Sequence, residues 1–172
     1  MIKPGTLLIA HPDLDDEFFQ FSTVLITEDH QHGTTGLCIN KLNDMSLSEA
    51  AGLQDWASTE ELYTGGPVNA RALIMIHSAD WYSSNTMPVN TEFSISSDQL
   101  MTEKIAMGND PRNYRFVNGV SSWKPKQLSE EIAQGKWLTM PASEAIVYGY
   151  TGETQWKKAI NNYAELAVAQ YF

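Results

Sequence analysis

The residue types best suited to chemistry gather in one stretch, Glu61–Ser78, where a Gly-Gly-Pro turn leads into an apolar run. Arg71 lies just before the run Ala72–Ile76, and His77 directly follows it. A guanidinium group suits bidentate contacts with anions, so Arg71 is a candidate anion binder. His77 is either a catalyst or, as is commoner at the end of a strand, a packed or capping histidine.

The turn before this run holds the most constrained backbone in the sequence. Gly65 and Gly66 can take positive φ without steric cost, whereas Pro67 fixes its own φ at about −65°. A residue that precedes proline is pushed out of the α region, so Gly66 is expected to be extended or in a turn. The turn either feeds a core strand or brings the backbone close to another strand, a partner or a ligand.

A second candidate corner begins at Trp123, beside Lys124 and Lys126. Pro125 stands where a helix can begin, and the free amides of a first helical turn favour an anion. Trp123 would then form a pocket wall; the alternative is that it packs against the helix and braces it. The candidate ligand-binding residues are Gly65, Gly66, Arg71, His77, Trp123 and Gln127, and no catalytic residue is identified.

Two groups of side chains resemble metal ligands only in part. The acidic loop 13–17 has the oxygen ligands that hard cations prefer, but it lacks the EF-hand spacing and its glycine. His30 and His32 form a His-x-His pair, which on a strand would point both rings to one face. This pair lies in a polar connection without a third ligand, so no metal site is predicted.

The single cysteine, Cys38, lies between Leu37 and Ile39 in an apolar segment. A nucleophilic cysteine needs an electropositive, accessible setting, so we expect a buried thiol that behaves as a small hydrophobe. Patterns for a nucleophile elbow, a phosphate-binding loop or a dinucleotide fold are absent from the sequence. We therefore predict no cofactor.

Length and composition are those of one globular domain that spans residues 1–172. One cysteine excludes an internal disulfide and suits a reducing cytosol. The apolar run 7–10 is too short for a signal peptide and leads into acidic residues, and no stretch reaches the length of a membrane span. We expect a cytoplasmic protein, either monomer or homodimer, without membrane contact.

The net charge of −10 is unevenly distributed along the chain. Residues 1–111 hold four Lys/Arg and sixteen Asp/Glu, whereas residues 112–172 hold seven Lys/Arg and five Asp/Glu. A protein that reads duplex DNA normally presents a concentrated basic face. The overall acidity therefore disfavours direct binding to nucleic acid.

Strand-like and helix-like segments alternate without an internal repeat or a linker. Strands are expected at 6–10, 21–27, 35–40, 72–76, 91–96, 114–117 and 137–140, and a polar connection is expected at 28–34. Helices are expected from the Ser46 capping box to Gly52, from 96 or 97 to about 107, from 125 to 135, at 143–148 and from 153 onward. This mixture of adjacent strands and interspersed helices predicts an α+β fold with a mixed sheet.

Several segments together resemble the YqgE/AlgH family. They are residues 4–10 with Asp16 and Phe18, 36–40, 65–68, 77–78, Trp123 with Gln127-Leu128, Trp137 and Trp156. The resemblance implies an α+β fold whose branched sheet is partly rolled into a small barrel, with helices around it. It brings no catalytic residues, only the label of a transcriptional regulator. Ser122 and Lys126 stand where the family pattern has glycine.

Three functions remain open on this basis. The first is a non-enzymatic binding or regulatory module that recognises a protein or a small anionic ligand. The alternative is a hydrolase or transferase acting on a small anionic substrate, which requires Arg71, His77 and the segment 123–127 to converge on one pocket. The third, a direct DNA-binding regulator, rests on the family label alone.

Overall fold

Nine strands form one sheet in the part of the chain that the computed structural model describes, residues 1–53 and 55–171. They are β1 (Thr6–Ala10), β2 (Thr23–His30), β3 (Gly33–Cys38), β4 (Leu62–Thr64), β5 (Val68–Ser78), β6 (Met87–Pro88), β7 (Phe93–Ser96), β8 (Tyr114–Trp123) and β9 (Trp137–Pro141). Neighbouring strands follow the order β6-β7-β5-β8-β3-β2-β1-β9, and β4 pairs with β8 outside this path.

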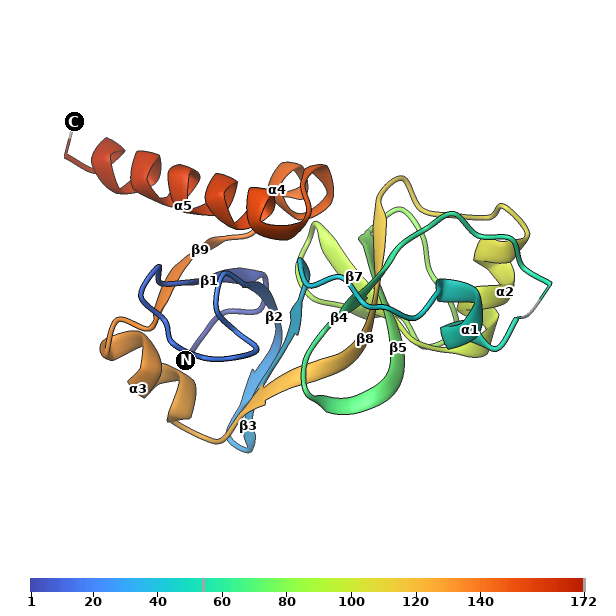
Figure 1. Cartoon of the computed structure of the whole chain (residues 1–172), viewed down its shortest axis with the longest axis horizontal. Helices are drawn as coiled ribbons and strands as arrows, with labels where there is room; N and C mark the ends of the chain where they lie inside the picture. Colours follow the sequence, from blue (N-terminus) through green and yellow to red (C-terminus); the bar gives the residue numbers. More distant parts are fainter. Residues whose placement is uncertain (54, 172) are drawn as a thin grey trace.

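Strand β8 joins the two halves of the sheet. Its first half pairs with β5, which is antiparallel, and with β4, which is parallel. Its last residues pair with the start of β3. Beyond that junction β3, β2, β1 and β9 curl into a half-barrel (Figure 1). The expected α+β fold with a mixed, branched and partly rolled sheet is confirmed.

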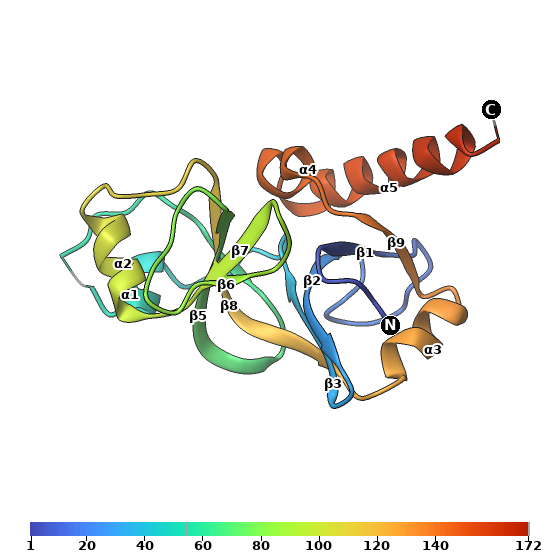
Figure 2. The same ribbon diagram turned by 180° about the vertical axis from the view of Figure 1, so that it is seen from behind.

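Five helices lie outside this sheet within the described residues. They are α1 (Leu47–Ala51), α2 (Gln99–Ala106), α3 (Gln127–Ala133), α4 (Glu144–Gly149) and α5 (Gly152–Ala169). Helices α3 and α5 lie on the side of the half-barrel, whereas α1 and α2 lie together at the opposite end (Figures 1 and 2). None of the described helices is long and apolar enough to cross a membrane.

Helix starts follow local capping chemistry. The Ser46 hydroxyl accepts a hydrogen bond from the Glu49 amide, as the capping-box pattern predicts, and Gly52 ends α1 in the left-handed region at φ 70°. Helix α3 differs, because Lys126 occupies its N-cap position with φ 70° and makes no side-chain capping bond. An L-residue pays a steric cost in that conformation, which glycine does not.

Two apolar clusters hold the elements together. The larger fills the half-barrel with buried residues from β1, β2 and β3, and it includes Trp137 and Trp156. The smaller lies between the other half of the sheet and α1 and α2, where Met75 and Phe116 pack against Leu47 and Met101. The strands β5 and β8 contribute to both clusters, so they tie the two halves into one packed unit.

Strand bounds differ from the sequence-based expectation in both directions. Strand β7 begins at Phe93 rather than at residue 91, whereas β2 continues to His30 and β3 begins at Gly33, so the polar connection expected at 28–34 is reduced to two residues. Strand β5 begins at Val68 rather than at residue 72, and β8 continues to Trp123 rather than ending at 117. The added residues of β5 are largely exposed, so they carry no hydrophobic signal. The short strands β4 and β6 were not expected, because two or three residues give no measurable period.

Candidate functional site

The Gly-Gly turn lies between β4 and β5 and packs against the backbone of β8. A β-carbon on Gly66 would lie 2.1 Å from the carbonyl carbon and oxygen of Val120, and one on Gly65 would lie 2.2 Å from the Gly119 oxygen. Positive φ occurs at neither glycine of the turn; it occurs at Gly119 on β8, at 81°, and at Asn69 just after the turn, at 54°. These glycines therefore allow two stretches of backbone to touch, and their contact is with a strand of the same chain.

Arg71 and His77 lie at opposite ends of β5. Arg71 is exposed within a bulge between Val68 and Leu73, where four residues of β5 stand opposite the single residue Gly119 of β8. His77 is fully buried near the other end. Six residues of extended strand span about 20 Å, so the two side chains do not share a pocket.

His77 is held on both sides by hydrogen bonds. Its Nδ1 lies 2.9 Å from the Ser78 carbonyl oxygen, which requires a proton on Nδ1, and its Nε2 lies 2.8 Å from the Ser96 hydroxyl. Burial lowers the pKa of the imidazole, so the ring is neutral at pH 7. This Ser–His geometry resembles that of an activated nucleophile, but Ser96 is only 1% exposed and a substrate has no access to it.

Trp123 and Gln127 hold the β8–α3 connection together. The Trp123 indole is buried and packs against Phe19 and Trp137, with ring centroids 5.9 and 6.2 Å away. The Gln127 Oε1 accepts a hydrogen bond of 3.0 Å from the Lys124 amide. His77 pairs with Tyr114 at the start of β8, nine residues from Trp123, which corresponds to about 30 Å of strand. The convergence that the enzyme hypothesis requires is therefore absent from the fold.

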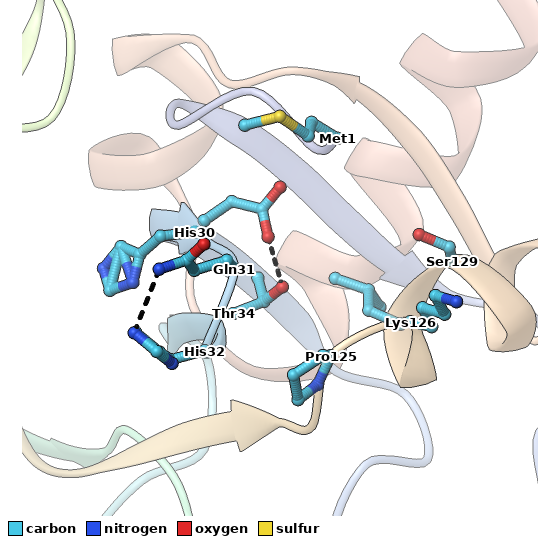
Figure 3. Close-up of a pocket in the computed structure, with 10 residues that line it drawn as sticks. Met1, His30, Gln31, His32, Thr34, Pro125, Lys126 and Ser129 are labelled. Carbon is cyan, nitrogen blue, oxygen red and sulfur yellow. Dashed lines mark hydrogen bonds between the residues drawn. The ribbon is translucent and has the colours of Figure 1, made fainter.

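A depression of about 720 Å³ lies between the tip of the β2–β3 hairpin and the start of α3 (Figure 3). The hairpin supplies His30, Gln31 and His32 on one side, and Pro125, Lys126 and Ser129 lie on the other. Met1, Asp29, Thr34 and Leu128 complete the lining. Pairing of Thr34 with Trp123 brings these two segments of the chain together.

Most of the polar lining of this depression is engaged locally. The Asp29 carboxylate accepts hydrogen bonds from the Thr34 hydroxyl at 2.6 Å and from the Ile2 amide at 2.7 Å. Nε2 of His30 lies 3.3 Å from a Glu28 oxygen, and the Gln31 amide lies 3.3 Å from the His32 ring. Among the described residues, no carboxylate lies within ion-pair distance of the exposed Lys126 ammonium.

The chemistry available in this depression is that of binding. It offers one uncompensated ammonium group, two exposed imidazoles and a carboxamide around an apolar floor at Leu128. No cluster of three metal-ligating side chains occurs in the part of the chain that the structure describes. Of the candidate corner at 123–127, only Pro125 and Lys126 line the depression, and none of the six candidate ligand-binding residues does.

Two further side chains with reactive groups lie outside the depression. One is buried, and the other is engaged in hydrogen bonds. Cys38 is fully buried, and burial raises the pKa of its thiol to about 11, so it is not a nucleophile at pH 7. The Asp16 carboxylate accepts hydrogen bonds from the Phe18 and Phe19 amides at 2.9 and 2.8 Å, which braces the loop after β1.

The depression was not recognisable from the sequence, because its walls are about ninety positions apart. Contact between the β2–β3 hairpin and the β8–α3 connection depends on strand pairing between β3 and β8. Local sequence patterns pointed to residues in both walls. These are the His-x-His pair of His30 and His32, and Lys126 near the expected helix start. The sequence contained no signal that would have joined them.

Comparison with known proteins places this geometry in a family. A family model described as AlgH-like matches residues 7–165. A UPF0301 protein of Methylococcus capsulatus is 32% identical over 163 residues, which cover 92% of this chain and 90% of that protein. A UPF0301 protein of a Marinomonas species is 34% identical over 158 residues, with 88% and 84% covered.

Two solved structures share the fold. The solution structure of the AlgH protein from Pseudomonas aeruginosa has a TM-score of 0.77 at 26% identity, with 91% of this chain and 86% of that chain covered. A crystal structure of a Corynebacterium diphtheriae protein has a TM-score of 0.78 at 22% identity, with 94% and 87% covered. The likeness to the second extends to the fold alone.

Proposed function

The chain belongs to the family of AlgH-like proteins, and we propose that it acts by binding rather than by catalysis. The partner is a protein whose acidic segment occupies the depression between the β2–β3 hairpin and α3. The observation that carries this proposal is Lys126, a cation on the wall of the depression that lies in a costly backbone conformation without an ion-pair partner among the described residues.

The state of the reactive side chains supports binding over turnover. Catalysis by nucleophilic attack needs an accessible nucleophile beside a base. In the described residues the serine that contacts a histidine ring, Ser96, is buried together with that ring, and the Cys38 thiol is buried and protonated. The open depression, in contrast, presents donors and a positive charge, and the hydroxyl there that donates to a carboxylate, Thr34 to Asp29, belongs to a buried residue.

The lining of the depression suits a segment of polypeptide. Its apolar floor with polar edges suits a side chain or a short segment of a second protein. An acidic segment complements the charge of Lys126 and can accept hydrogen bonds from the N–H groups of the two imidazoles.

Position 126 also makes the proposal specific to this chain. The family pattern has glycine there, and the φ of 70° explains why glycine suits the position. Lysine keeps that backbone conformation at a cost and adds a charge at the edge of the depression. The preference for an acidic segment of a partner protein is therefore proposed for this chain rather than for every AlgH-like protein.

A photo-crosslinking experiment tests this proposal. The photoreactive residue p-benzoylphenylalanine replaces Gln31 in the depression, and in a matched control it replaces the exposed Lys157 on α5. We expect a discrete crosslinked protein from position 31 alone, joined through a segment rich in Asp or Glu. Crosslinks that are the same from both positions, or that join a segment without acidic residues, would contradict the proposal.

A further inference from the structure

A second, smaller pocket of about 220 Å³ lies where β4, the start of β8 and the end of α4 meet. Its lining includes Arg115, three tyrosines (Tyr63, Tyr114 and Tyr148) and two carboxylates (Glu60 and Glu61). We propose that this pocket binds a small zwitterion of the free α-amino acid class. The ligand carboxylate meets Arg115 and Tyr148, and its ammonium group meets Glu60 and Glu61.

The first argument comes from Arg115, whose guanidinium is a buried cation without a carboxylate partner. The residue is 7% exposed, and no carboxylate among the described residues lies within ion-pair distance of it. Two of its N–H groups donate to carbonyl oxygens, to Ile39 at 2.7 Å and to Tyr150 at 3.0 Å, and the group lies 4.7 Å from the Tyr63 ring centre. Burial lowers the pKa of this guanidinium, but arginine keeps its charge in proteins.

These contacts orient the guanidinium, and the Glu61 carboxylate attracts it only from beyond ion-pair distance. Buried charges in proteins are normally paired with an opposite charge, because an uncompensated charge of low exposure is costly. Carbonyl oxygens and an aromatic face supply only partial negative charge. A bound carboxylate would supply the missing charge and would accept the remaining N–H donors in a fork geometry.

The second argument comes from Tyr148, a residue that lines the same pocket. Its hydroxyl oxygen is buried and has no hydrogen-bond partner among the described residues. Burial, followed by the nearby Glu144 carboxylate, raises the pKa of the phenol, so the group stays protonated and can donate a hydrogen bond. A buried hydroxyl without a partner is unusual in proteins, and an acceptor in the pocket would satisfy it.

The two carboxylates at the rim of the pocket, Glu60 and Glu61, restrict which anions can bind. Glu60 accepts a hydrogen bond from the Tyr114 hydroxyl at 3.1 Å, and Glu61 accepts one from the Tyr63 hydroxyl at 2.8 Å. Both glutamates are exposed and negatively charged, so they oppose the entry of a simple anion such as phosphate. A zwitterion avoids this repulsion, because its ammonium group pairs with the rim while its carboxylate points inward.

The volume limits the size of the ligand. At about 220 Å³ the pocket is smaller than the sites of about 300–1,000 Å³ that take drug-sized molecules. Free amino acids with small side chains fit this limit. The pocket lies near Tyr114 at the start of β8, and the depression at Lys126 lies beyond the far end of that strand, so the two sites are independent.

The test is a titration of the ¹⁵N-labelled protein, followed by NMR, with L-alanine and L-serine at millimolar concentrations. Propionate, which has only the carboxylate, and ethylamine, which has only the ammonium group, serve as comparison probes. We expect saturable shifts in the amides of residues 59–63, 114–116 and 148–150 with the amino acids, and much weaker shifts with either probe. Absence of saturable shifts, or equal shifts with propionate or ethylamine, would overturn the proposal.

Three variants separate binding from folding. Tyr148→Phe removes the unpartnered hydroxyl and keeps the ring, and we expect about tenfold weaker binding with an unchanged unfolding midpoint. Glu61→Gln should weaken binding of the amino acids and should reduce the ratio of their affinity to that of propionate. Tyr163→Phe on α5 is the matched control and should bind like the unmodified protein. Unchanged affinity in Tyr148→Phe would show that the hydroxyl does not contact the ligand.

Discussion

The substitution Gly66→Ala tests the contact on which the turn between β4 and β5 depends. The added methyl carbon would lie 2.1 Å from the Val120 carbonyl carbon and 2.3 Å from the Ser121 amide nitrogen, where ordinary contact begins at 3.4 Å. Both neighbours are backbone atoms of β8 and cannot rotate away. The two segments must therefore separate by more than about 1 Å, which exceeds what a packed interior absorbs without strain.

The expected cost follows from what that separation breaks. The neighbouring Gly65 donates to the Asn118 oxygen at 2.7 Å, and its own oxygen accepts from the Cys38 amide at 2.8 Å and from the Ser121 hydroxyl at 2.9 Å. Overpacking of this kind typically costs about 1–3 kcal/mol, and the weakened hydrogen bonds place Gly66→Ala at the upper end, at about 3 kcal/mol.

Urea denaturation followed by tryptophan fluorescence measures this cost. A loss of about 3 kcal/mol with an unchanged slope would lower the midpoint by about 1–2 M for a protein of this size. Gly149→Ala is the matched control, because a β-carbon there meets nothing within 4 Å and we expect a change within about 1 kcal/mol. An unchanged midpoint and slope in Gly66→Ala would refute the close-contact argument.

Three other predictions concern the thiol, acid stability and nucleic acid. Cys38 should resist a water-soluble thiol reagent in the folded protein and react after unfolding, because it is fully buried; fast labelling of the folded protein would contradict this. Burial opposes ionisation of Asp98, but hydrogen bonds from Ser83 and Ser84 prevail and lower its pKa from 3.8 to about 2. Its contribution to stability should therefore be complete above pH 3.8 and disappear as the pH falls toward 2, and Asp98→Asn should flatten that part of the pH curve of unfolding free energy. Duplex DNA should bind no more tightly than the non-specific range of about 10⁻⁴–10⁻⁶ M in fluorescence anisotropy at physiological salt, given the net charge of −10; sub-micromolar binding would contradict this.

Local patterns in the sequence predicted the local structure well. The apolar run at 72–76 is within β5, the Ser46 capping box opens α1, and the helical spacing after residue 153 corresponds to α5. These features depend on residues that are close together in the chain. The family resemblance supplied the branched and partly rolled sheet, which periodicity alone does not determine.

Long-range pairing accounts for what the sequence did not show. The bulge after Val68 and the reversal of φ at Gly119 depend on how β5 and β8 pair, and neither leaves a hydrophobic pattern. Arg115 is an ordinary cation in the sequence, and its burial beneath Tyr63 becomes visible only when β4 and β8 are side by side. The depression similarly requires the pairing of β3 with β8.

The most direct test of the binding function compares the unmodified protein with Lys126→Gly. Glycine removes the charge and also relieves the positive φ, so the variant should be at least as stable as the unmodified protein in urea. The binding partner in this test is a synthetic peptide of the acidic segment identified by crosslinking from position 31. In calorimetry it should bind Lys126→Gly about two- to fivefold more weakly than the unmodified protein, as expected for loss of an exposed ion pair. Weaker binding by a stable Lys126→Gly protein is the predicted result, and unchanged affinity would contradict the proposed site.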